Sequence, residues 1–375
     1  MPAREARFCA VYRVSGGMPA ARGRAWEICL EQTVELPEGL VPSGFVRDHV
    51  LGKVETLEAS RAGCLATISY PVGTTAGELT QLLNVLFGNT SIKPGVRLER
   101  LILPPALLRR FAGPRFGVAG LRQHLGVPRR PLLCAALKPL GLSAEELAEL
   151  AYRFALGGID IVKDDHGLSD QPYAPFDARV RRCAAAVARA NRKTGFGSVY
   201  AANVTAPHAE LVTRARFARA AGAGALLVSP GLAGLDAMRT LAGDPSINLP
   251  ILAHPALQGS YVLHPDSGIS HYALFGQIAR LAGADASIYP SYGGRFSFSR
   301  EECATIVEGC RVKMGRLRPI FPCPGGGMRL DQVPELLEFY GSEAIFLLGR
   351  GLLEHSPDVV ENCRLFRKMV EDGIA

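Results

Sequence analysis

Side chains that can move protons or bind a hard metal ion gather in short runs, each directly after an apolar segment. Lys163-Asp164-Asp165-His166 is the most charged run, and Lys138 and His254 follow two other apolar segments. Asp165 offers carboxylate oxygen, whereas Lys163 can offer oxygen only if its amine becomes a carbamate, an anion that binds Mg²⁺. The run predicts a hard-metal site, with a solvated charge cluster as the alternative, and His254 alone could equally be a core histidine.

Glycine-rich runs that could bind phosphate stand near the C-terminal end of the sequence. Gly325-Gly326-Gly327 and Gly349-Arg350-Gly351 each follow an apolar segment. Backbone N–H groups of such runs hold phosphate in parallel barrels, although each run alone could be a simple turn. Arg295, on a glycine-rich loop, could place a mobile cation over a phosphorylated sugar. With the net charge of +7, these features indicate a small phosphorylated metabolite as ligand.

The apolar segments that must position these groups alternate with helical patterns from about residue 125 onward. Such alternation is typical of βα units and a parallel sheet. Eight strands are predicted, at 131–137, 159–163, 198–204, 223–229, 250–254, 286–289, 318–322 and 344–348. Helices are predicted at 143–155, 175–191, 209–221, 300–309 and 330–340. We therefore expect a (β/α)8 (TIM) barrel over residues 123–375, with its site at the carboxyl ends of the strands; a doubly wound open sheet is the alternative.

The first part of the chain has a different pattern. Strands are predicted at 7–14, 46–58 and 64–70, and helices at 22–30 and 74–87. This order predicts a small N-terminal α+β domain, of the ferredoxin-like kind, over residues 1–122. The proline-rich stretch 103–114 is the predicted connection to the barrel.

Composition narrows the class of protein. The chain has 375 residues, 48% of them hydrophobic and 21% charged, which is typical of a globular protein with two domains. Nine scattered cysteines without a CxxC pair indicate reduced thiols in a cytoplasm. Basic clusters are short, so no nucleic-acid partner is expected. No apolar run is long enough to span a bilayer and no signal peptide is evident, so no membrane partner is expected either.

Four segments resemble motifs of the ribulose-bisphosphate carboxylase (rubisco) large-chain superfamily, in the same order along the chain. Residues 157–165 (GGIDIVKDD) resemble the activation-lysine motif, and residues 137–143 (LKPLGLS) resemble the catalytic-lysine motif. Phe87-Gly88-Asn89 and Glu31 in residues 30–33 (LEQT) resemble substrate-binding elements of the N-terminal domain. The resemblance implies a homodimer with shared active sites, or a higher oligomer built from such dimers.

The resemblance also implies a role for each matching residue of the barrel. Lys163 would be the carbamylated metal ligand and Asp165 a second ligand, with Mg²⁺ as the expected ion. Lys138 would be an acid/base group beside an enediolate, assisted by His254, and Arg295 would stand near the place of a flexible-loop lysine. The residues implied to hold one phosphate are Gly326, Gly327, Gly349 and Arg350.

Glu31 and Asn89 are the implied contributions of the N-terminal domain. Both would reach into the active site of the partner subunit, which would make the dimer obligatory.

Several positions depart from the carboxylase pattern. His166 stands in place of the third metal carboxylate, so another divalent metal, or a metal-free site, is an alternative to Mg²⁺. Leu140 replaces a lysine, Pro255 replaces the arginine that grips a second phosphate, and Ile288 or Tyr289 falls at a histidine position. A further histidine position carries Gln258. These changes resemble the rubisco-like proteins (form IV), which enolise other substrates and do not fix CO₂.

We therefore expect Mg²⁺-dependent enolisation of a small phosphorylated keto-sugar or oxo-acid, by an enzyme of isomerase, decarboxylase or hydrolase type. Asn89 stands where the diketo-phosphate enolases carry lysine, which ranks that activity lower. A metal-free Schiff-base lyase using Lys138 or Lys163 is one alternative. A non-catalytic phosphosugar-binding relative is the other, because His166 and Leu140 could mark a decayed site.

Overall fold

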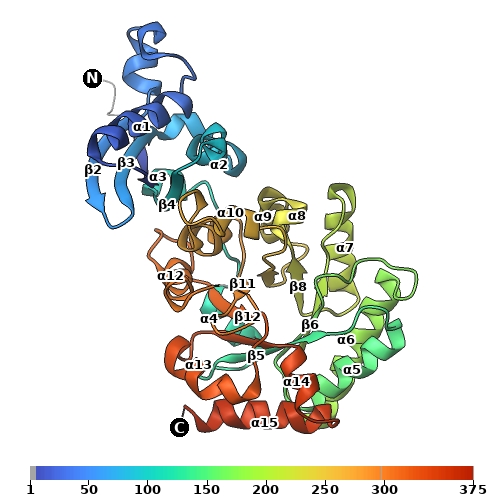
Figure 1. Cartoon of the computed structure of the whole chain (residues 1–375). Helices are drawn as coiled ribbons and strands as arrows, with labels where there is room; N and C mark the ends of the chain where they lie inside the picture. The colour runs from blue at the N-terminus through green and yellow to red at the C-terminus, as the bar shows by residue number, and fades with distance from the viewer. Residues whose placement is uncertain (1–5, 297, 375) are drawn as a thin grey trace.

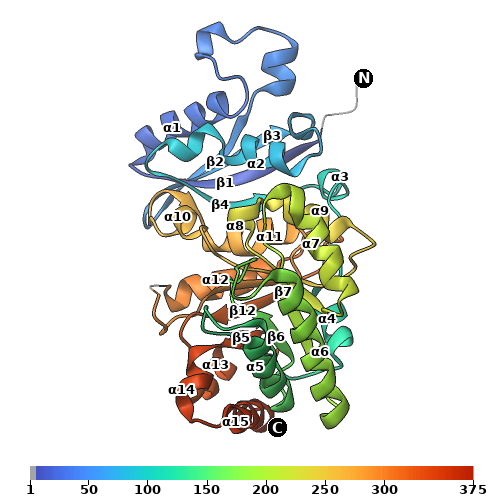
Figure 2. The same cartoon turned by 90° about the vertical axis from the view of Figure 1, so that its right-hand side faces the viewer.

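An N-terminal domain is built on a five-stranded sheet, in the computed structural model that describes residues 6–296 and 298–374. The strand order is β10-β4-β1-β3-β2. The bounds are β1 (Arg7–Val14), β2 (Lys53–Ser60), β3 (Gly63–Pro71), β4 (Val96–Ile102) and β10 (Gly268–Ile269). Helices α1 (Met18–Glu31) and α2 (Leu79–Phe87) cover the face of this sheet away from the barrel (Figures 1 and 2). Alternate residues of β1 are fully buried, as expected of a strand that packs one face against helices.

Two predicted elements of this domain have different bounds. The predicted strand 46–58 is wrong in its first part, because Val46–Val50 forms a π-helical turn and the strand begins only at β2. Gly52 lies between the two elements, and a Cβ there would lie 3.1 Å from the Cα of Cys29. The predicted helix 74–87 is wrong in its first turn, because Ala76 and Gly77 have φ of 50° and 73°, which ends a 3₁₀ turn before α2 begins. The pattern also missed β4 and the two-residue β10.

The C-terminal part is the expected barrel of eight parallel strands, in the order β12-β11-β9-β8-β7-β6-β5-β13, and β12 and β13 lie side by side to close it. Its strands are β5 (Leu132–Leu137), β6 (Ile161–Asp164), β7 (Val199–Asn203), β8 (Ala225–Val228), β9 (Ile251–Ala253), β11 (Ala286–Pro290), β12 (Phe321–Gly325) and β13 (Ile345–Leu348). The open-sheet alternative is therefore wrong. The predicted strand 318–322 was displaced toward the N-terminus, because Pro322 and Pro324 ordinarily end a central strand and here lie inside one.

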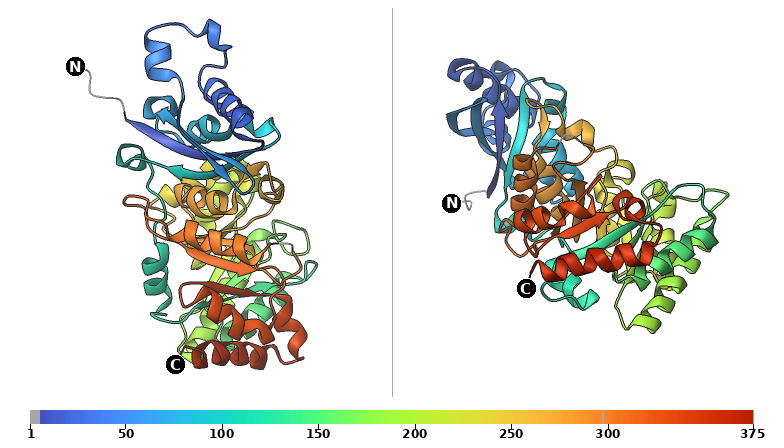
Figure 3. Two further views of the ribbon diagram at one scale, coloured as in Figure 1. Left: turned by 60° about the vertical axis from the view of Figure 1, so that its left-hand side comes forward. Right: turned by 60° about the horizontal axis from the view of Figure 1, so that its bottom comes forward.

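Helices surround the barrel between successive strands. They are α5 (Ala144–Leu156), α6 (Phe176–Thr194), α7 (His208–Ala220), α8 (Pro230–Ala233), α9 (Leu235–Gly243), α10 (Gly259–Val262), η5 (Tyr272–Ile278), α11 (Ala279–Leu281), α12 (Arg300–Arg311), α13 (Val333–Tyr340), α14 (Arg350–His355) and α15 (Val359–Asp372). Helix α5 begins with a capping box, in which Ser143 Oγ accepts from the Glu146 N–H at 3.2 Å. The N-terminal domain and α15 lie at opposite ends of the molecule (Figure 3).

The barrel interior is filled by alternate residues of its strands, because successive side chains of a strand point to opposite faces. Leu132, Cys134 and Ala136 of β5 belong to the interior cluster, whereas Leu133 and Ala135 pack with the surrounding helices. Helix α4 (Gly117–Leu125) adds Val118, Leu121 and Leu125 to the same interior cluster. Residue 122 lies inside this helix, and the division into domains at 122 and 123 stays a proposal.

All nine cysteines are free, and eight of them are buried. None of the helices within residues 6–296 and 298–374 combines the length and apolar character that a membrane crossing requires.

His271, at the start of η5, gives the stability of the fold a pH dependence. Burial lowers its pKa to about 4, against the opposing effect of Glu302 and with the help of Arg97. An unfolded chain would bind a proton at this histidine below pH 6.5, whereas the folded protein stays neutral there down to about pH 4. Stability from this group is therefore complete above pH 6.5 and is lost as the pH falls.

We expect the His271→Phe variant to lose less free energy of unfolding than the parent between pH 7 and pH 5. The difference should be roughly 2 kcal/mol, since each pH unit corresponds to about 1.4 kcal/mol for one proton. Chemical denaturation at both pH values measures it. The same substitution at His355, which is exposed, should leave the pH dependence unchanged. Parallel pH profiles for the parent and His271→Phe would contradict the assignment.

Candidate active site

A cavity of about 620 Å³ opens at the carboxyl ends of the barrel strands. It is lined by every barrel residue that the sequence singled out for chemistry: Lys138, Lys163, Asp165, His166, His254, Arg295, Gly326, Gly327, Gly349 and Arg350. The alternation of the strands explains several of these placements. Ile161 points into the barrel, so Lys163 and Asp165 continue the inward series, just as His254 follows Leu252 and Gly349 follows Leu347.

Lys163 is the most deeply buried charged group of the cavity. Lys163 is only 2% exposed, and its Nζ donates a 2.7 Å hydrogen bond to the carbonyl oxygen of Asp164. Burial holds the pKa of this amine below its ordinary value. A neutral amine is the form that can react with CO₂ to give a carbamate, and it is also the form that attacks a carbonyl carbon.

Asp165 links Lys163 to the other ionisable groups. Its carboxylate forms a close ion pair with Lys138 Nζ and accepts from the backbone N–H of Gly167 at 3.1 Å. His166 Nδ1 lies 3.3 Å from the same carboxylate. Burial raises the pKa of Asp165, but the hydrogen bonds from Lys138 and Gly167 and the positive charges of Lys163 and Lys138 together outweigh it, so the pKa lies below its usual value. Asp165 is therefore an anion at neutral pH, with a cation already in contact.

The imidazoles of His166 and His254 stack on each other, with centroids 4.3 Å apart and planes inclined by 10°. Burial, with a further contribution from Lys163, lowers the pKa of His254 to about 2, so this ring is neutral at physiological pH. Its Nδ1 accepts from the backbone N–H of Ala256 at 3.2 Å, which assigns the ring proton to Nε2. His254 can therefore donate a hydrogen bond to an oxygen in the cavity.

Asp164, between the two inward residues, points away from the cavity and anchors the end of β6. Its carboxylate meets Arg179 Nε at 3.2 Å, Tyr200 OH at 2.7 Å and the Asn203 N–H at 3.0 Å, with Asp164 and Arg179 fully buried. Asn203 also donates from its amide to the carbonyl oxygens of His166 and Leu168. Removing one partner of a buried ion pair typically lowers the free energy of unfolding by about 3–5 kcal/mol. We therefore expect these contacts to hold the end of β6 in place.

The sequence analysis missed Arg179 and Tyr200 as partners of Asp164. Both lie on neighbouring elements, and no local pattern links them to Asp164. The alternation along β6 could have separated outward Asp164 from inward Lys163 and Asp165.

Both glycine runs line the cavity, and the backbone geometry of the first run requires glycine at two positions. Gly326 and Gly327 have φ of +80° and +117°. A Cβ on Gly326 would lie 2.9 Å from the Phe296 ring, and one on Gly327 would lie 3.1 Å from the Arg295 nitrogen. The Arg295 N–H donates to the Gly326 carbonyl at 3.2 Å, which ties the Arg295 loop to this run.

Arg350 lines the same cavity, but its guanidinium is engaged elsewhere. Its side chain is exposed and forms an ion pair with Glu354. A Cβ on Gly349 would lie 3.5 Å from Lys138 Cε, which is an ordinary contact distance. A larger residue would therefore fit at Gly349, unlike at Gly326 and Gly327.

Pro255 and Ile288 line another part of the cavity, where the carboxylase pattern would place an arginine and a histidine. Neither side chain can donate a hydrogen bond. Leu140 is 49% exposed and lies beside Gly167, outside the set of lining residues.

Glu31 and Asn89 come together on the N-terminal domain, but they do not line the cavity of their own chain. Asn89 Nδ2 donates to Glu31 Oε1 at 3.1 Å and to Glu35 Oε1 at 2.8 Å, and Lys93 Nζ lies 3.2 Å from Glu31. The hydrogen bond from Asn89 and the contact with Lys93 lower the pKa of Glu31. The structure therefore brings these two residues into one polar cluster, separate from the barrel residues.

The donor set suits a divalent cation only if Lys163 is carbamylated. Among the described residues, no group of three or more His, Cys, Asp or Glu side chains could hold a metal ion. Asp165 and His166 supply two donors, and a carbamate on the buried Lys163 would supply a third that is anionic. One imidazole in the set is compatible with Mn²⁺ or a softer ion as well as Mg²⁺.

Comparison with known proteins gives consistent matches over most of the chain. Residues 117–295 match the model for the ribulose bisphosphate carboxylase large chain, catalytic domain. The chain is 38% identical to ribulose bisphosphate carboxylase-like protein 1 of Rhodopseudomonas palustris over 96% of both chains. It is 38% identical to 5-methylthioribulose-1-phosphate isomerase of Rhodospirillum rubrum, over 96% of this chain and 95% of that one. A 2,3-diketo-5-methylthiopentyl-1-phosphate enolase of Bacillus pumilus is 35% identical over 81% of this chain and 75% of that one.

Solved structures show the same similarity in three dimensions. A rubisco-like protein from Rhodopseudomonas palustris superimposes with a TM-score of 0.89 at 35% identity, covering 98% of this chain and 99% of that one. An octameric rubisco from Pyrococcus horikoshii matches with a TM-score of 0.89 at 29% identity, covering 100% and 89%. A dimeric archaeal rubisco from Hyperthermus butylicus matches with a TM-score of 0.88 at 28% identity, covering 100% and 92%.

Proposed function

Because the chain belongs to the ribulose bisphosphate carboxylase large-chain family, as a rubisco-like protein, we propose that it enolises a small phosphorylated keto-sugar or oxo-acid and does not fix CO₂. The net reaction would be an isomerisation, or a carbon–carbon cleavage of decarboxylase or hydrolase type. Two relatives are named 5-methylthioribulose-1-phosphate isomerase and 2,3-diketo-5-methylthiopentyl-1-phosphate enolase. Both names support isomerisation over carbon–carbon cleavage.

The observation that carries this proposal is the ion pair between Lys138 and Asp165 in a cavity that the buried Lys163 also lines. A proton on a carbon next to a carbonyl leaves only if a base is within reach and the developing oxyanion is stabilised. Lys138, or the carbamate of Lys163, is the proposed base. His254, neutral with its proton on Nε2, is the proposed hydrogen-bond donor to an oxygen of the substrate.

The other residues bind and orient. Gly326, Gly327, Gly349 and the Arg350 backbone would hold the phosphate, and Arg295 would lie over the bound substrate. A divalent cation held by carbamylated Lys163, Asp165 and His166 would supply Lewis-acid stabilisation of the enolate. Asp165 would also hold Lys138 in place until substrate binds, since their ion pair is already formed.

Exchange of a carbon-bound proton tests this function directly. We expect the protein to catalyse C–H exchange of 5-methylthioribulose 1-phosphate or a related sugar monophosphate in D₂O, with Mg²⁺ and bicarbonate present, followed by NMR. The Lys138→Met variant is the matched negative control. No exchange across a broad panel of keto-sugar and oxo-acid phosphates, with binding retained, would favour the non-catalytic alternative.

One observation favours a second candidate function. The depressed pKa of Lys163 is also what a Schiff-base lysine requires. Covalent trapping by borohydride in the presence of substrate and a chelator would assign a metal-free lyase instead.

We further propose a homodimer in which Glu31 and Asn89 complete the partner's site. If so, mixing Asn89→Ala and Lys163→Ala chains should restore about a quarter of the parent activity, because half of the randomly formed dimers would carry one intact site of two. The control mixes Lys163→Ala with Lys138→Met chains. Both defects then lie in the barrel, so no intact site forms and no activity should return. Absence of recovery in the first mixture after verified subunit exchange would contradict shared sites.

A further inference from the structure

A segment of the barrel leaves it after β9 and joins the sheet of the N-terminal domain. Four residues of this segment line the cavity, namely Pro255, Ala256, Gly259 and Leu263. A few residues later β10 pairs in parallel with β4, with Gly268 opposite Arg97 and Ile269 opposite Leu98. Helix α10 lies between the N-terminal sheet and the rest of the barrel (Figure 2). One wall of the cavity is thus held by the small domain.

Arg97, on β4, makes the densest set of contacts with this wall. Its side chain is nearly buried, at 6% residue exposure. The guanidinium donates to the carbonyl oxygen of Val262 at 3.3 Å, and it also donates to the carbonyl oxygens of His264 and Ser267. Val262 directly precedes Leu263, so the arginine holds the backbone of a cavity-lining residue.

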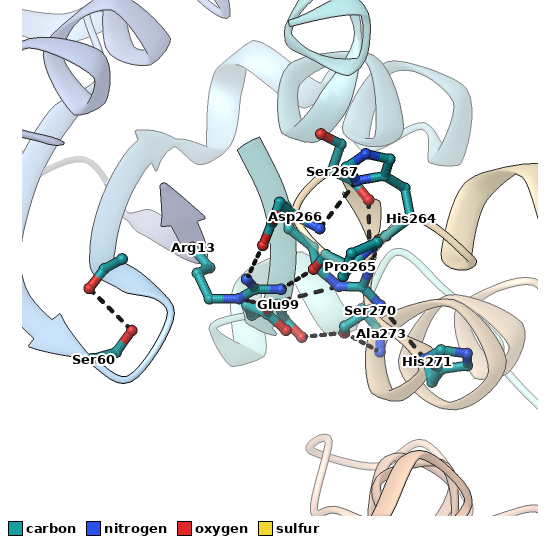
Figure 4. Close-up of polar contacts among 12 residues, drawn as sticks. Arg13, Ser60, Glu99, His264, Pro265, Asp266, Ser267, Ser270, His271 and Ala273 are labelled. Carbon is teal, nitrogen blue, oxygen red and sulfur yellow. Dashed lines mark hydrogen bonds and ion pairs between the residues drawn. The ribbon is translucent and has the colours of Figure 1, made fainter. Parts of the chain in front are cut away.

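The chain around these carbonyls has little freedom to move elsewhere. Gly268 has φ of +96°, and a Cβ there would lie 2.2 Å from the Tyr261 carbonyl oxygen, so only glycine fits between α10 and β4. Ser267 Oγ accepts from the Gly95 N–H at 2.9 Å. Arg13 contacts Asp266 at 3.1 Å and also donates to the Pro265 carbonyl (Figure 4).

Arg97 also reaches a second wall of the cavity. Its Nη2 lies 3.5 Å from Nδ1 of His271, whose ring meets Phe298 edge-on with centroids 4.4 Å apart. Phe298 lines the cavity and follows the Arg295 loop. The Glu302 carboxylate lies 3.6 Å from the same Nδ1, so this nitrogen can accept from Arg97 in one tautomer of the neutral ring and donate to Glu302 in the other.

We propose that Arg97 is a positioning residue for substrate selection. Through its guanidinium, the small domain sets the cavity wall at Gly259 and Leu263 that receives the part of the substrate away from its phosphate. The proposal rests on the proposed function for the identity of the ligand, whereas the clamp itself can be measured without any substrate. The phosphate end, at Gly326 and Gly327, has no contact with Arg97 among the hydrogen bonds and ion pairs of the described residues.

The first experiment measures the clamp in the ligand-free protein by amide hydrogen exchange and mass spectrometry. Arg97→Met should raise the exchange rate of residues 259–270 at least tenfold and leave β5 and β6 unchanged. Arg100→Met is the matched control, because it removes an arginine from the same strand that is not bonded to the segment. Unchanged exchange at 259–270 would overturn the proposal whether or not the proposed function holds.

The second experiment separates the wall from the phosphate end by calorimetry. Arg97→Met should weaken 5-methylthioribulose 1-phosphate at least tenfold and leave inorganic phosphate within twofold of the parent, with Arg97→Lys in between. Equal weakening of both ligands would overturn the proposal. If the parent binds phosphate but no sugar phosphate, the proposed function fails and the exchange result alone decides. Ser267→Ala removes a single hydrogen bond of the same segment, the one from the Gly95 N–H. It should raise the amide exchange rate of residues 259–270 by less than Arg97→Met, and it is used in place of Arg97→Met if that variant does not fold.

Discussion

Replacing Lys163 by alanine is expected to remove both divalent-cation binding and activity, the latter by roughly a thousandfold or more. Asp165 and His166 alone supply one negative charge, which is too little to hold a hard cation that prefers oxygen ligands. The same variant deletes the amine on which a Schiff base could form. Loss of activity is therefore expected for either chemistry, and loss of Mg²⁺ affinity only for the carbamate.

Calorimetry with Mg²⁺ and bicarbonate distinguishes the two, with activity measured by C–H exchange. Lys193→Ala is the control, because this lysine is exposed at the end of α6, outside the cavity. Because Lys163 is buried, the unfolding curve of Lys163→Ala must also be compared with that of the parent. Unchanged Mg²⁺ affinity in a folded Lys163→Ala protein would show that Lys163 is not a ligand.

Substrates with one phosphate should bind more tightly than their bisphosphate counterparts, by a factor of about a hundred or more. No CO₂ should be incorporated into ribulose bisphosphate. A desolvated phosphate needs charge-assisted donors, each contributing roughly 1.5–3 kcal/mol. The glycine runs can offer such donors at one end of the cavity. The side chains of Pro255 and Ile288, which line another part of the cavity, offer no hydrogen-bond donor.

A competition series of matched sugar monophosphates and bisphosphates measures this preference, together with ¹⁴CO₂ incorporation. Pro255→Arg is the informative variant, because it adds a guanidinium to the lining and should narrow the gap between the two series. Bisphosphates that bind more tightly than every monophosphate, or measurable incorporation of ¹⁴CO₂ by the parent, would falsify the prediction.

Much of the barrel could be predicted because most of its strands are short apolar runs and its longer helices have a helical period of apolar residues. The strand at β6 and the capping box at Ser143 are examples in which the signal lies within a few residues. The errors fell where backbone conformation interrupts a continuous pattern. Ala76 and Gly77 break the helix expected over 74–87, and Pro322 and Pro324 lie inside a strand that they would ordinarily end.

By itself, the sequence determined which chemical groups follow which strands, and so which residues can meet at one end of a parallel barrel. Alternation along a strand then sends Lys163 and Asp165 inward and Asp164 outward, since neighbouring side chains point to opposite faces. Only the tertiary structure decided what surrounds these groups. The ion pair of Asp164 with Arg179 and the clamp of Arg97 on Val262 join residues 15 and 165 positions apart. Such contacts depend on how helices and domains pack, and no local pattern of residues encodes them.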